Sequence, residues 1–223
     1  MSTGDSAPGP REIDAILYDF GGVIIEIDFD WIFERWAEIA GVPCERVKSR
    51  FSHGEAYRRH ERGEIELGEY FRALRAELGL ELDDAQLIDG WQRVFGPEHP
   101  EVVALLRALR GRVPQYLLSN TNATHYDYFR HRYARALAPL DRIFASCEMG
   151  RRKPEPQAFE HVARATGVPL ERMLFLDDTV ANLDGAQALG MKTVHVRSPQ
   201  DAVRALAPWL EAPAPVVAAS HAM

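Results

Sequence analysis

The chain has 223 residues, with 33 acidic and 26 basic side chains that give a formal charge of −7. A chain of this length forms one or two domains and buries enough apolar surface to fold without a disulfide or a structural metal. The acidic balance argues against nucleic acid or an anionic membrane surface as a partner, because both need clustered positive charge. No apolar run approaches the roughly 18 residues of a membrane span.

The two ends and the cysteines predict a cytoplasmic protein. Residues 1–10 and 212–223 are rich in Pro, Ala, Gly and Ser, which predicts flexible tails. The start carries neither a basic segment nor an apolar stretch, so it is not expected to be a secretory signal. Cys44 and Cys147 lie far apart and match no disulfide or zinc pattern, which favours reduced thiols.

The first predicted element is a buried strand over residues 15–18, a short apolar run bounded by polar residues. It ends at Asp19, and the chain then turns through Gly21 and Gly22. Glycine lets the backbone approach a ligand closely, so the carboxylate of Asp19 can be exposed at a sharp turn. Such a carboxylate is a candidate covalent nucleophile toward phosphorus or carbon.

From Trp31 to Phe95 the sequence shows only helical periodicity. We therefore expect an all-helical domain over residues 29–96, inserted into a core formed by residues 11–28 and 97–211. Trp31, Trp36 and Trp91 lie at helical spacings among apolar residues and are expected to pack inside this domain. The expected helices have apolar faces that end at Gly41, at Gly79 and, for the last helix, at Phe95.

The rest of the chain alternates strands with helices, which predicts a doubly wound parallel sheet of the α/β class with a Rossmann-like core. Two of the helical patterns are followed by a glycine, the expected stop signal. The predicted strands cover residues 115–118, 142–145, 173–176 and 192–196, and the predicted helices cover 100–110, 156–166, 178–189 and 199–210.

Polar residues follow three of the predicted strands. Asp19 follows the first strand, Ser119 and Asn120 follow the second, and Asp177 and Asp178 follow the fourth. Strands often end in such turn-forming residues. In open parallel sheets, however, ligands bind outside the carboxyl ends of the strands. Three strands that deliver polar groups to one edge therefore favour a shared site.

Three carboxylates near one point predict a cation. Two unit charges about 4 Å apart repel by roughly 4 kcal/mol at an effective dielectric constant near 20. Mg²⁺ suits a site made of carboxylates, phosphate and water. Lys153 is one of only three lysines beside 23 arginines, and its compact ammonium can lie between a carboxylate and a phosphate. Asp177 and Asp178 alone would also fit a helix N-terminus.

These motifs, in this order, resemble those of the haloacid dehalogenase-like hydrolases, and the helical insert resembles the C1 cap of that superfamily. A closer likeness is to bacterial α-D-glucose-1-phosphate phosphatases and to the phosphatase half of soluble epoxide hydrolases; it rests on residues 51–56, 60–65, 90–92, 118–122 and 175–178. The superfamily motifs are Asp19-Phe20-Gly21-Gly22-Val23, Leu118-Ser119-Asn120, Lys153-Pro154 and Leu176-Asp177-Asp178 through Asn182.

The resemblance implies a Mg²⁺-dependent phosphatase for small phosphomonoesters, and the substrates it leads us to expect are sugar phosphates such as α-D-glucose 1-phosphate. Asp19 would attack phosphorus and form an aspartyl-phosphate. The metal would be bound by Asp19, the main-chain carbonyl of Gly21 and Asp178, with Asp177 supporting this set and Asn182 behind it. Ser119, the amide of Asn120 and Lys153 would hold the phosphoryl oxygens as charge develops. The sequence leaves the oligomeric state open.

Gly21 departs from the family pattern, because most family phosphatases carry there a second aspartate that acts as acid and then base. A positioned acid of this kind contributes typically 10²–10⁴-fold. An anomeric hydroxyl leaves with less help than an ordinary sugar alcohol, so we expect Gly21 to favour sugar 1-phosphates. The acid could instead come from Asp28, or from His53 or His60 in the insert.

The insert carries a dense polar run that could bind sugar hydroxyls. Of this run we take His53 as the substrate-binding candidate, and His125 lies near enough to the second motif to reach the cleft. A solvated helix face would explain the run equally well. Its members are His53, Glu55, Arg58, His60, Glu61 and Arg62.

Two other functions stay open. A haloacid dehalogenase would use Asp19 against carbon without a metal, but Asp177 and Asp178 without a cation would repel the carboxylate of its substrate. A catalytically weak binding module has Gly21 as its only support. Loss of activity in a chelator separates the phosphatase from the dehalogenase.

Overall fold

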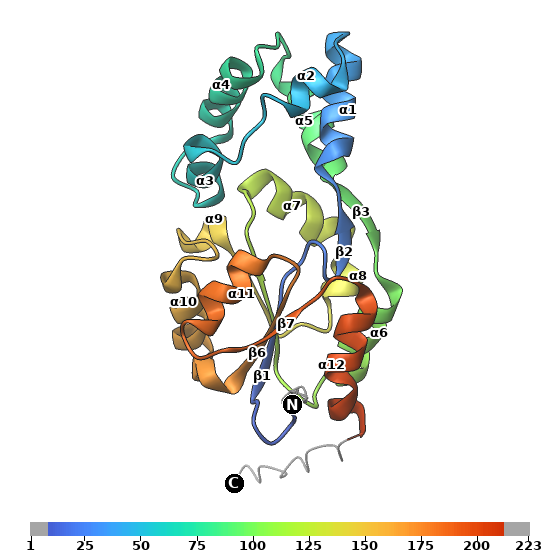
Figure 1. Cartoon of the computed structure of the whole chain (residues 1–223), viewed down its shortest axis with the longest axis vertical. Coiled ribbons are helices and arrows are strands. Elements are labelled where there is room, and N and C mark those ends of the chain that lie inside the picture. The colour runs from blue at the N-terminus through green and yellow to red at the C-terminus, as the bar shows by residue number, and fades with distance from the viewer. Residues whose placement is uncertain (1–8, 212–223) are drawn as a thin grey trace, which may run out of the picture.

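The computed structural model describes residues 9–211, so the predicted tails lie outside the described residues except for residues 9 and 10. An α/β lobe and a separate group of helices lie one above the other along the long axis of the molecule (Figure 1). Among the helices of residues 9–211, none has both the length and the apolar character needed to cross a membrane.

The sheet of the larger lobe, the core, has five parallel strands in the order β5-β4-β1-β6-β7. This confirms the predicted α/β fold. β1 lies at the centre between β4 and β6, so the carboxyl ends of these three strands are neighbours. The strands are β1 (Ala15–Tyr18), β4 (Gln115–Ser119), β5 (Arg142–Ala145), β6 (Met173–Asp177) and β7 (Lys192–His195).

Helices cover both faces of the sheet (Figure 1), because successive side chains of a strand point to opposite faces. Ile16 and Tyr18 pack on one face, and Ala15 and Leu17 pack on the other. The first face is covered by α6 (Pro100–Leu109), α7 (Ala123–Arg132), α8 (Ala134–Leu137) and α12 (Pro199–Glu211), and the second by α9 (Ser146–Met149), α10 (Pro156–Thr166) and α11 (Val180–Gln187), with the short η2 (Leu170–Arg172) leading into β6.

The group of helices, here called the cap, has an apolar core of its own. Trp36 and Trp91 are fully buried there, with rings stacked 5.7 Å apart, whereas Trp31 is only half-buried and lies against Gly96. The cap consists of α1 (Phe29–Ala40), α2 (Cys44–Lys48), α3 (Glu55–Glu61), α4 (Leu67–Leu78), α5 (Asp84–Trp91) and η1 (Gln92–Val94).

Two short strands join the cap to the core, and the sequence pattern did not predict them. β2 (Ile25–Ile27) and β3 (Phe95–Glu98) pair in antiparallel fashion and are called the stalk below. The expectation of helix up to Phe95 was therefore wrong, since α5 ends at Trp91 and Phe95 begins β3. Three residues in β2 and a proline inside β3 give too weak an alternation to predict strands.

Candidate active site

A buried lysine lies at the carboxyl edge of the sheet. Lys153 is 1% exposed, and its Nζ lies 2.8 Å from Asp19 Oδ1 and 2.7 Å from Asp177 Oδ2. Burial acts to lower the pKa of Lys153, but the two carboxylates outweigh it and raise the pKa. The side chain is therefore an ammonium that bridges the ends of β1 and β6.

Asn120, at the end of β4, fixes the loop that carries this lysine. Its Nδ2 donates to the carbonyl of Lys153 at 2.9 Å, and the backbone N–H of Lys153 donates to its Oδ1 at 2.8 Å. The side-chain amide is thus committed to the backbone of Lys153. Through this pair of bonds, Asn120 positions the ammonium.

Asp177 is fully buried, and its carboxylate is saturated by donors. Besides Lys153, the backbone N–H of Thr179 donates to Oδ1 at 2.8 Å, and Asn182 Nδ2 lies 3.1 Å from each oxygen. Asn182 reaches the carboxylate because it lies in the first turn of α11. Asp177 is therefore a fixed anion that holds Lys153 in place.

The oxygens of Asp19, Asp177 and Asp178 lie within 4.8 Å of one another. Burial raises the pKa of Asp19 to about 7 against the effect of Lys153, and the other two carboxylates add to the rise. Burial and Asp177 raise the pKa of Asp178 as well. Three carboxylates against one ammonium leave an excess of negative charge, and oxygen ligands suit a hard cation such as Mg²⁺. The residues therefore fit the metal that the sequence predicts.

Gly22 allows the carboxylate of Asp178 to lie against the turn after β1. Its φ is +72°, and a Cβ at this position would collide with Asp178 Oδ2. Position 22 therefore requires a glycine for two reasons, its backbone conformation and the lack of space for a side chain.

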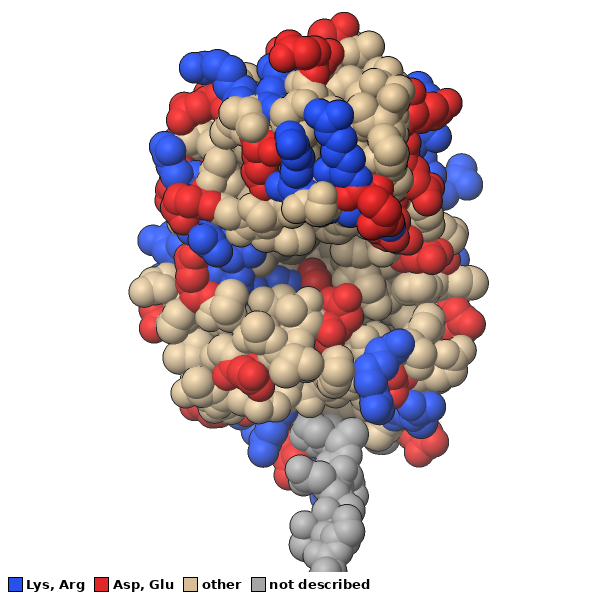
Figure 2. Space-filling model, turned by 45° about the horizontal axis from the view of Figure 1, so that its top comes forward, with Lys and Arg blue, Asp and Glu red and all other residues tan. Residues whose placement is uncertain are grey.

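A cavity of about 390 Å³ lies between this edge of the core and the cap. Figure 2 shows the groove between the two lobes, with basic and acidic side chains within it. Asp19, Gly21, Ser119, Asn120, Lys153 and Asp178 line it from the core, while His53, Tyr57 and Glu61 of the cap and Ile27 and Phe95 of the stalk line it from the other side. The sequence-predicted site residues thus meet around one cavity, with Asp177 directly beneath.

Of the three residues considered as an alternative acid, Asp28, His53 and His60, one lines the cavity of the site and two do not. His53 lines the cavity, and burial lowers its pKa. The side chain of Asp28 accepts from the backbone N–H of Asp30 and caps α1 instead. His60 is stacked on Tyr70, and it lines a different cavity between α3 and α7.

His125 reaches the cavity from α7, as its position in the sequence suggested. Its Nε2 lies 2.9 Å from the carbonyl of Trp91, so this nitrogen carries the proton and donates it. Burial lowers the pKa of His125 to about 3. The ring is therefore neutral, and its N–H is already committed to the backbone.

Sequence reasoning missed the pairing of Glu61 with Arg152. Glu61 is 4% exposed, which contradicts a solvated helix face for this residue, and Arg152 Nε donates to its Oε2 at 2.7 Å. The acidic residues in the polar run of the cap and the arginines just before Lys153 were a sequence signal for an ion pair between the two lobes. They did not indicate which acid would pair with which base.

Ile27 occupies the space beside Gly21. A Cβ at Gly21 would lie 2.6 Å from Ile27 Cδ1. The place where an aspartate side chain would begin is thus filled by a side chain of the stalk.

The model of the haloacid dehalogenase-like hydrolase family matches residues 13–190. The chain belongs to this family. A haloacid dehalogenase-like enzyme of Bacteroides thetaiotaomicron, solved in complex with magnesium and inorganic phosphate, superposes with a TM-score of 0.71 at 28% identity, over 81% of this chain and 92% of that one. The predicted superfamily is therefore confirmed.

Two phosphatases are among the relatives of this haloacid dehalogenase-like protein. A D-ribitol-5-phosphate phosphatase of Bacteroides thetaiotaomicron is 25% identical over 186 residues, which cover 81% of this chain and 90% of that protein. A sesquiterpene phosphatase of Aspergillus oryzae is 28% identical over 187 residues, which cover 82% and 89%. These relatives support the prediction of a phosphoric monoester hydrolase.

Proposed function

We propose that the protein is a Mg²⁺-dependent phosphatase of small phosphomonoesters, with sugar phosphates such as α-D-glucose 1-phosphate as substrates. One observation carries this proposal: the carboxylate of Asp19 lines a cavity, 2.8 Å from a buried ammonium and beside the carboxylate of Asp178. A nucleophile, a fixed cation and oxygen ligands for a metal are the groups that phosphoryl transfer requires.

In the first step, an oxygen of Asp19 attacks phosphorus. A bond forms between that oxygen and phosphorus, and the bond from phosphorus to the organic oxygen breaks. The organic oxygen leaves with the electron pair and takes a proton from water. The product is an aspartyl-phosphate on Asp19. Lys153 and Ser119 would hold the phosphoryl oxygens, and Asp177 and Asn120 would keep the ammonium of Lys153 in position.

The residues that would hold Mg²⁺ are Asp19, the main-chain carbonyl of Gly21 and Asp178. When bound, the ion would supply positive charge to the phosphoryl oxygens. Because the oxygens of Asp177 are taken by Lys153, Thr179 and Asn182, this residue would support the site through the lysine.

The test is phosphate release from α-D-glucose 1-phosphate, with Mg²⁺ and with a chelator, using Asp19→Asn as the blank. We expect release that needs the metal and is absent from the variant. Release that is insensitive to the chelator would contradict the metal requirement. Release by Asp19→Asn at the wild-type rate would contradict the nucleophile.

The sugar 1-phosphate preference has its own test, since it rests on Gly21. With no aspartate at this position, leaving groups that need little protonation should react best. We expect kcat/KM to be higher for glucose 1-phosphate than for glucose 6-phosphate. A preference for the 6-phosphate would contradict this assignment.

A further inference from the structure

Glycine at position 21 leaves the second half of the proposed reaction without a base. A good leaving group helps only the first step. Hydrolysis of the aspartyl-phosphate on Asp19 is the same for every substrate, and the attacking water must always lose a proton. The base must therefore be another residue that lines the cavity.

Most of the titratable groups around the cavity are committed elsewhere. The N–H of His125 is used by the carbonyl of Trp91, and burial lowers its pKa to about 3. Lys153 is an ammonium between two carboxylates, and Asp178 lies at the proposed metal position. Burial raises the pKa of Tyr57 well above its usual range, so its hydroxyl keeps its proton. His53 and Glu61 remain.

Glu61 has the features of a base. Its side chain lines the cavity and accepts from Arg152 Nε at 2.7 Å and from the hydroxyl of Tyr57. A carboxylate has about four acceptor positions, so these two donors leave room for a water molecule. Burial raises the pKa of Glu61, and Arg152 opposes this rise. Burial outweighs Arg152, so this carboxylate accepts a proton more readily than an exposed glutamate does.

Although Glu61 belongs to the cap, it is anchored to the catalytic edge of the core. Ser146 Oγ lies 2.7 Å from the carbonyl oxygen of Glu61 and accepts from the backbone N–H of Thr121 at 2.8 Å. Thr121 follows Ser119 by two residues, and Arg152 directly precedes Lys153. Both the backbone and the side chain of Glu61 are thus tied to segments that carry site residues.

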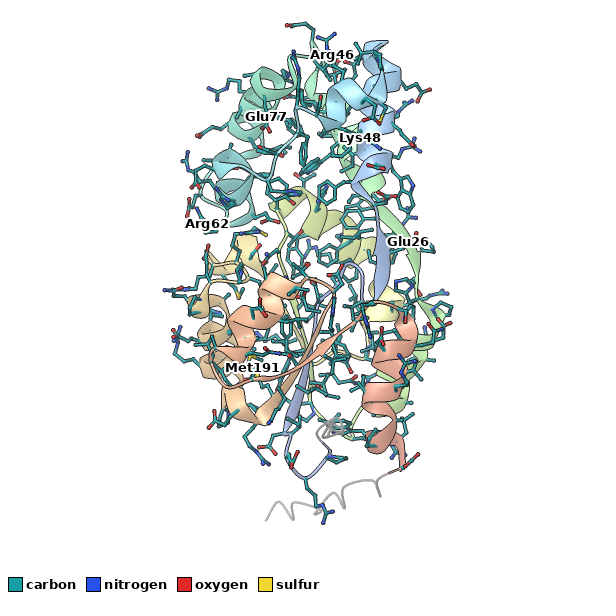
Figure 3. All side chains as sticks on the ribbon, viewed as in Figure 1. Glu26, Arg46, Lys48, Arg62, Glu77 and Met191 are labelled. Carbon is teal, nitrogen blue, oxygen red and sulfur yellow. The ribbon has the colours of Figure 1, made fainter. Side chains whose placement is uncertain are left out.

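The cap is attached to the core on two sides of the cavity. In Figure 3, Glu26 lies on the stalk at one side, and Arg62 lies at the end of α3 on the other side, facing the core. Arg62 Nη1 is 3.2 Å from Glu155 Oε1 of the core. Glu61 therefore sits at a docked end of the cap.

We propose that Glu61 is the general base for hydrolysis of the aspartyl-phosphate, an inference that rests on the proposed function. A water oxygen forms a bond to phosphorus, and the bond from phosphorus to Asp19 breaks, returning its electron pair to the carboxylate. The water proton passes to Glu61, and from there to solvent. The products are inorganic phosphate and free Asp19.

The experiment is a burst assay with p-nitrophenyl phosphate and Mg²⁺, in which nitrophenol reports the first step and phosphate reports the second. The variants are Glu61→Gln, Glu61→Asp, His53→Gln and Glu64→Gln. Glu64 is the matched control, because it is an acid three residues away that pairs with Arg62 and does not line the cavity.

For Glu61→Gln we expect a burst of about one nitrophenol per chain at the wild-type rate. A steady rate lower by roughly 10²–10⁴-fold should follow, with a phosphoryl group on the chain in mass spectrometry. Glu61→Asp should restore part of the steady rate, and Glu64→Gln should behave like the wild type.

A purely structural role of Glu61, through Arg152, would slow the burst and the steady rate together, and that result would overturn the proposal. An unchanged steady rate in Glu61→Gln would also overturn the proposal, as would a phosphorylated chain that accumulates in His53→Gln and not in Glu61→Gln. Failure of the proposed function gives a different result in the same assay: no metal-dependent release by the wild type, or release by Asp19→Asn.

Discussion

Lys153 is a buried ammonium, and both of its partners are carboxylates of the site. Asp177 is fully buried, and the side chain of Asp19 is 14% exposed. Removing one member of such a group leaves the other charges uncompensated, which costs about 3–5 kcal/mol. The same residue is therefore expected to govern both the stability of the fold and its chemistry.

Replacing this ammonium tests the expectation. Lys153→Met should lower the free energy of unfolding by about 3–5 kcal/mol and abolish phosphate release. Adding Asp177→Asn removes one of the stranded charges, so the double variant should regain part of the stability but none of the activity. Denaturant unfolding of the three proteins measures this. Equal stability of Lys153→Met and the wild type would show that the charges are compensated elsewhere.

The sequence allowed part of the site to be predicted at the level of residues. Asp19, Ser119 and Asp178 each follow a buried strand, and the parallel sheet alone brings such positions together. The pairing of Glu61 with Arg152 joins residues 91 positions apart on two lobes. It depends on how the cap docks, which no local pattern encodes.

At the scale of elements, the connections of the cap decide the geometry of the cavity. The stalk is one connection. The loop after α3 is the other, where Gly63 has a φ of +67° and the carbonyl of Cys147 occupies the place of a Cβ. Gly41, at the end of α1, also has a positive φ of +64°, but no other atom lies within 4 Å of the position that a Cβ of residue 41 would take.

These two glycines make a matched pair of variants. Gly63→Ala and Gly41→Ala should each lose about 1–2 kcal/mol of stability, because the left-handed conformation disfavours a Cβ. Only Gly63→Ala should move the cap off α9 and lower kcat/KM, by up to about 10²-fold, the effect of misplacing a catalytic group by about 1 Å. Similar kcat/KM values for both variants would contradict a catalytic role of this docking.

Periodicity predicted all the strands of the central sheet and four helices of the core, α6, α10, α11 and α12, because these are short buried runs and amphipathic stripes. It did not predict α7, α8 and α9. It failed at the stalk. There β2 has only three residues and β3 contains Pro97. The pairing of two such segments, separated by the whole cap, depends on long-range packing.

At the scale of the whole molecule, buried neutral histidines make the fold sensitive to acid. His125 has a folded pKa of about 3 against an ordinary value of 6.5, because it is buried. Above pH 6.5 both the folded and the unfolded chain hold it neutral. Below that pH the unfolded chain binds a proton that the folded chain does not, so stability falls as the pH falls.

His125→Gln keeps an N–H for the carbonyl of Trp91 but does not titrate. The free energy of unfolding of the wild type should therefore fall more steeply than that of the variant below pH 6.5, by up to about 1.4 kcal/mol per pH unit. Denaturant unfolding from pH 7 toward pH 4 measures the two slopes. Parallel slopes for the wild type and His125→Gln would contradict a buried neutral His125.

The central claim is that Asp19 carries the phosphoryl group during turnover. Rapid acid quench of the protein with Mg²⁺ and α-D-glucose 1-phosphate, followed by mass spectrometry of its peptides, tests it most directly. We predict one phosphoryl group, mapped to Asp19, in the wild type and none in Asp19→Asn. Phosphate release with no phosphoryl group on the chain, or with one on another residue, would contradict the account.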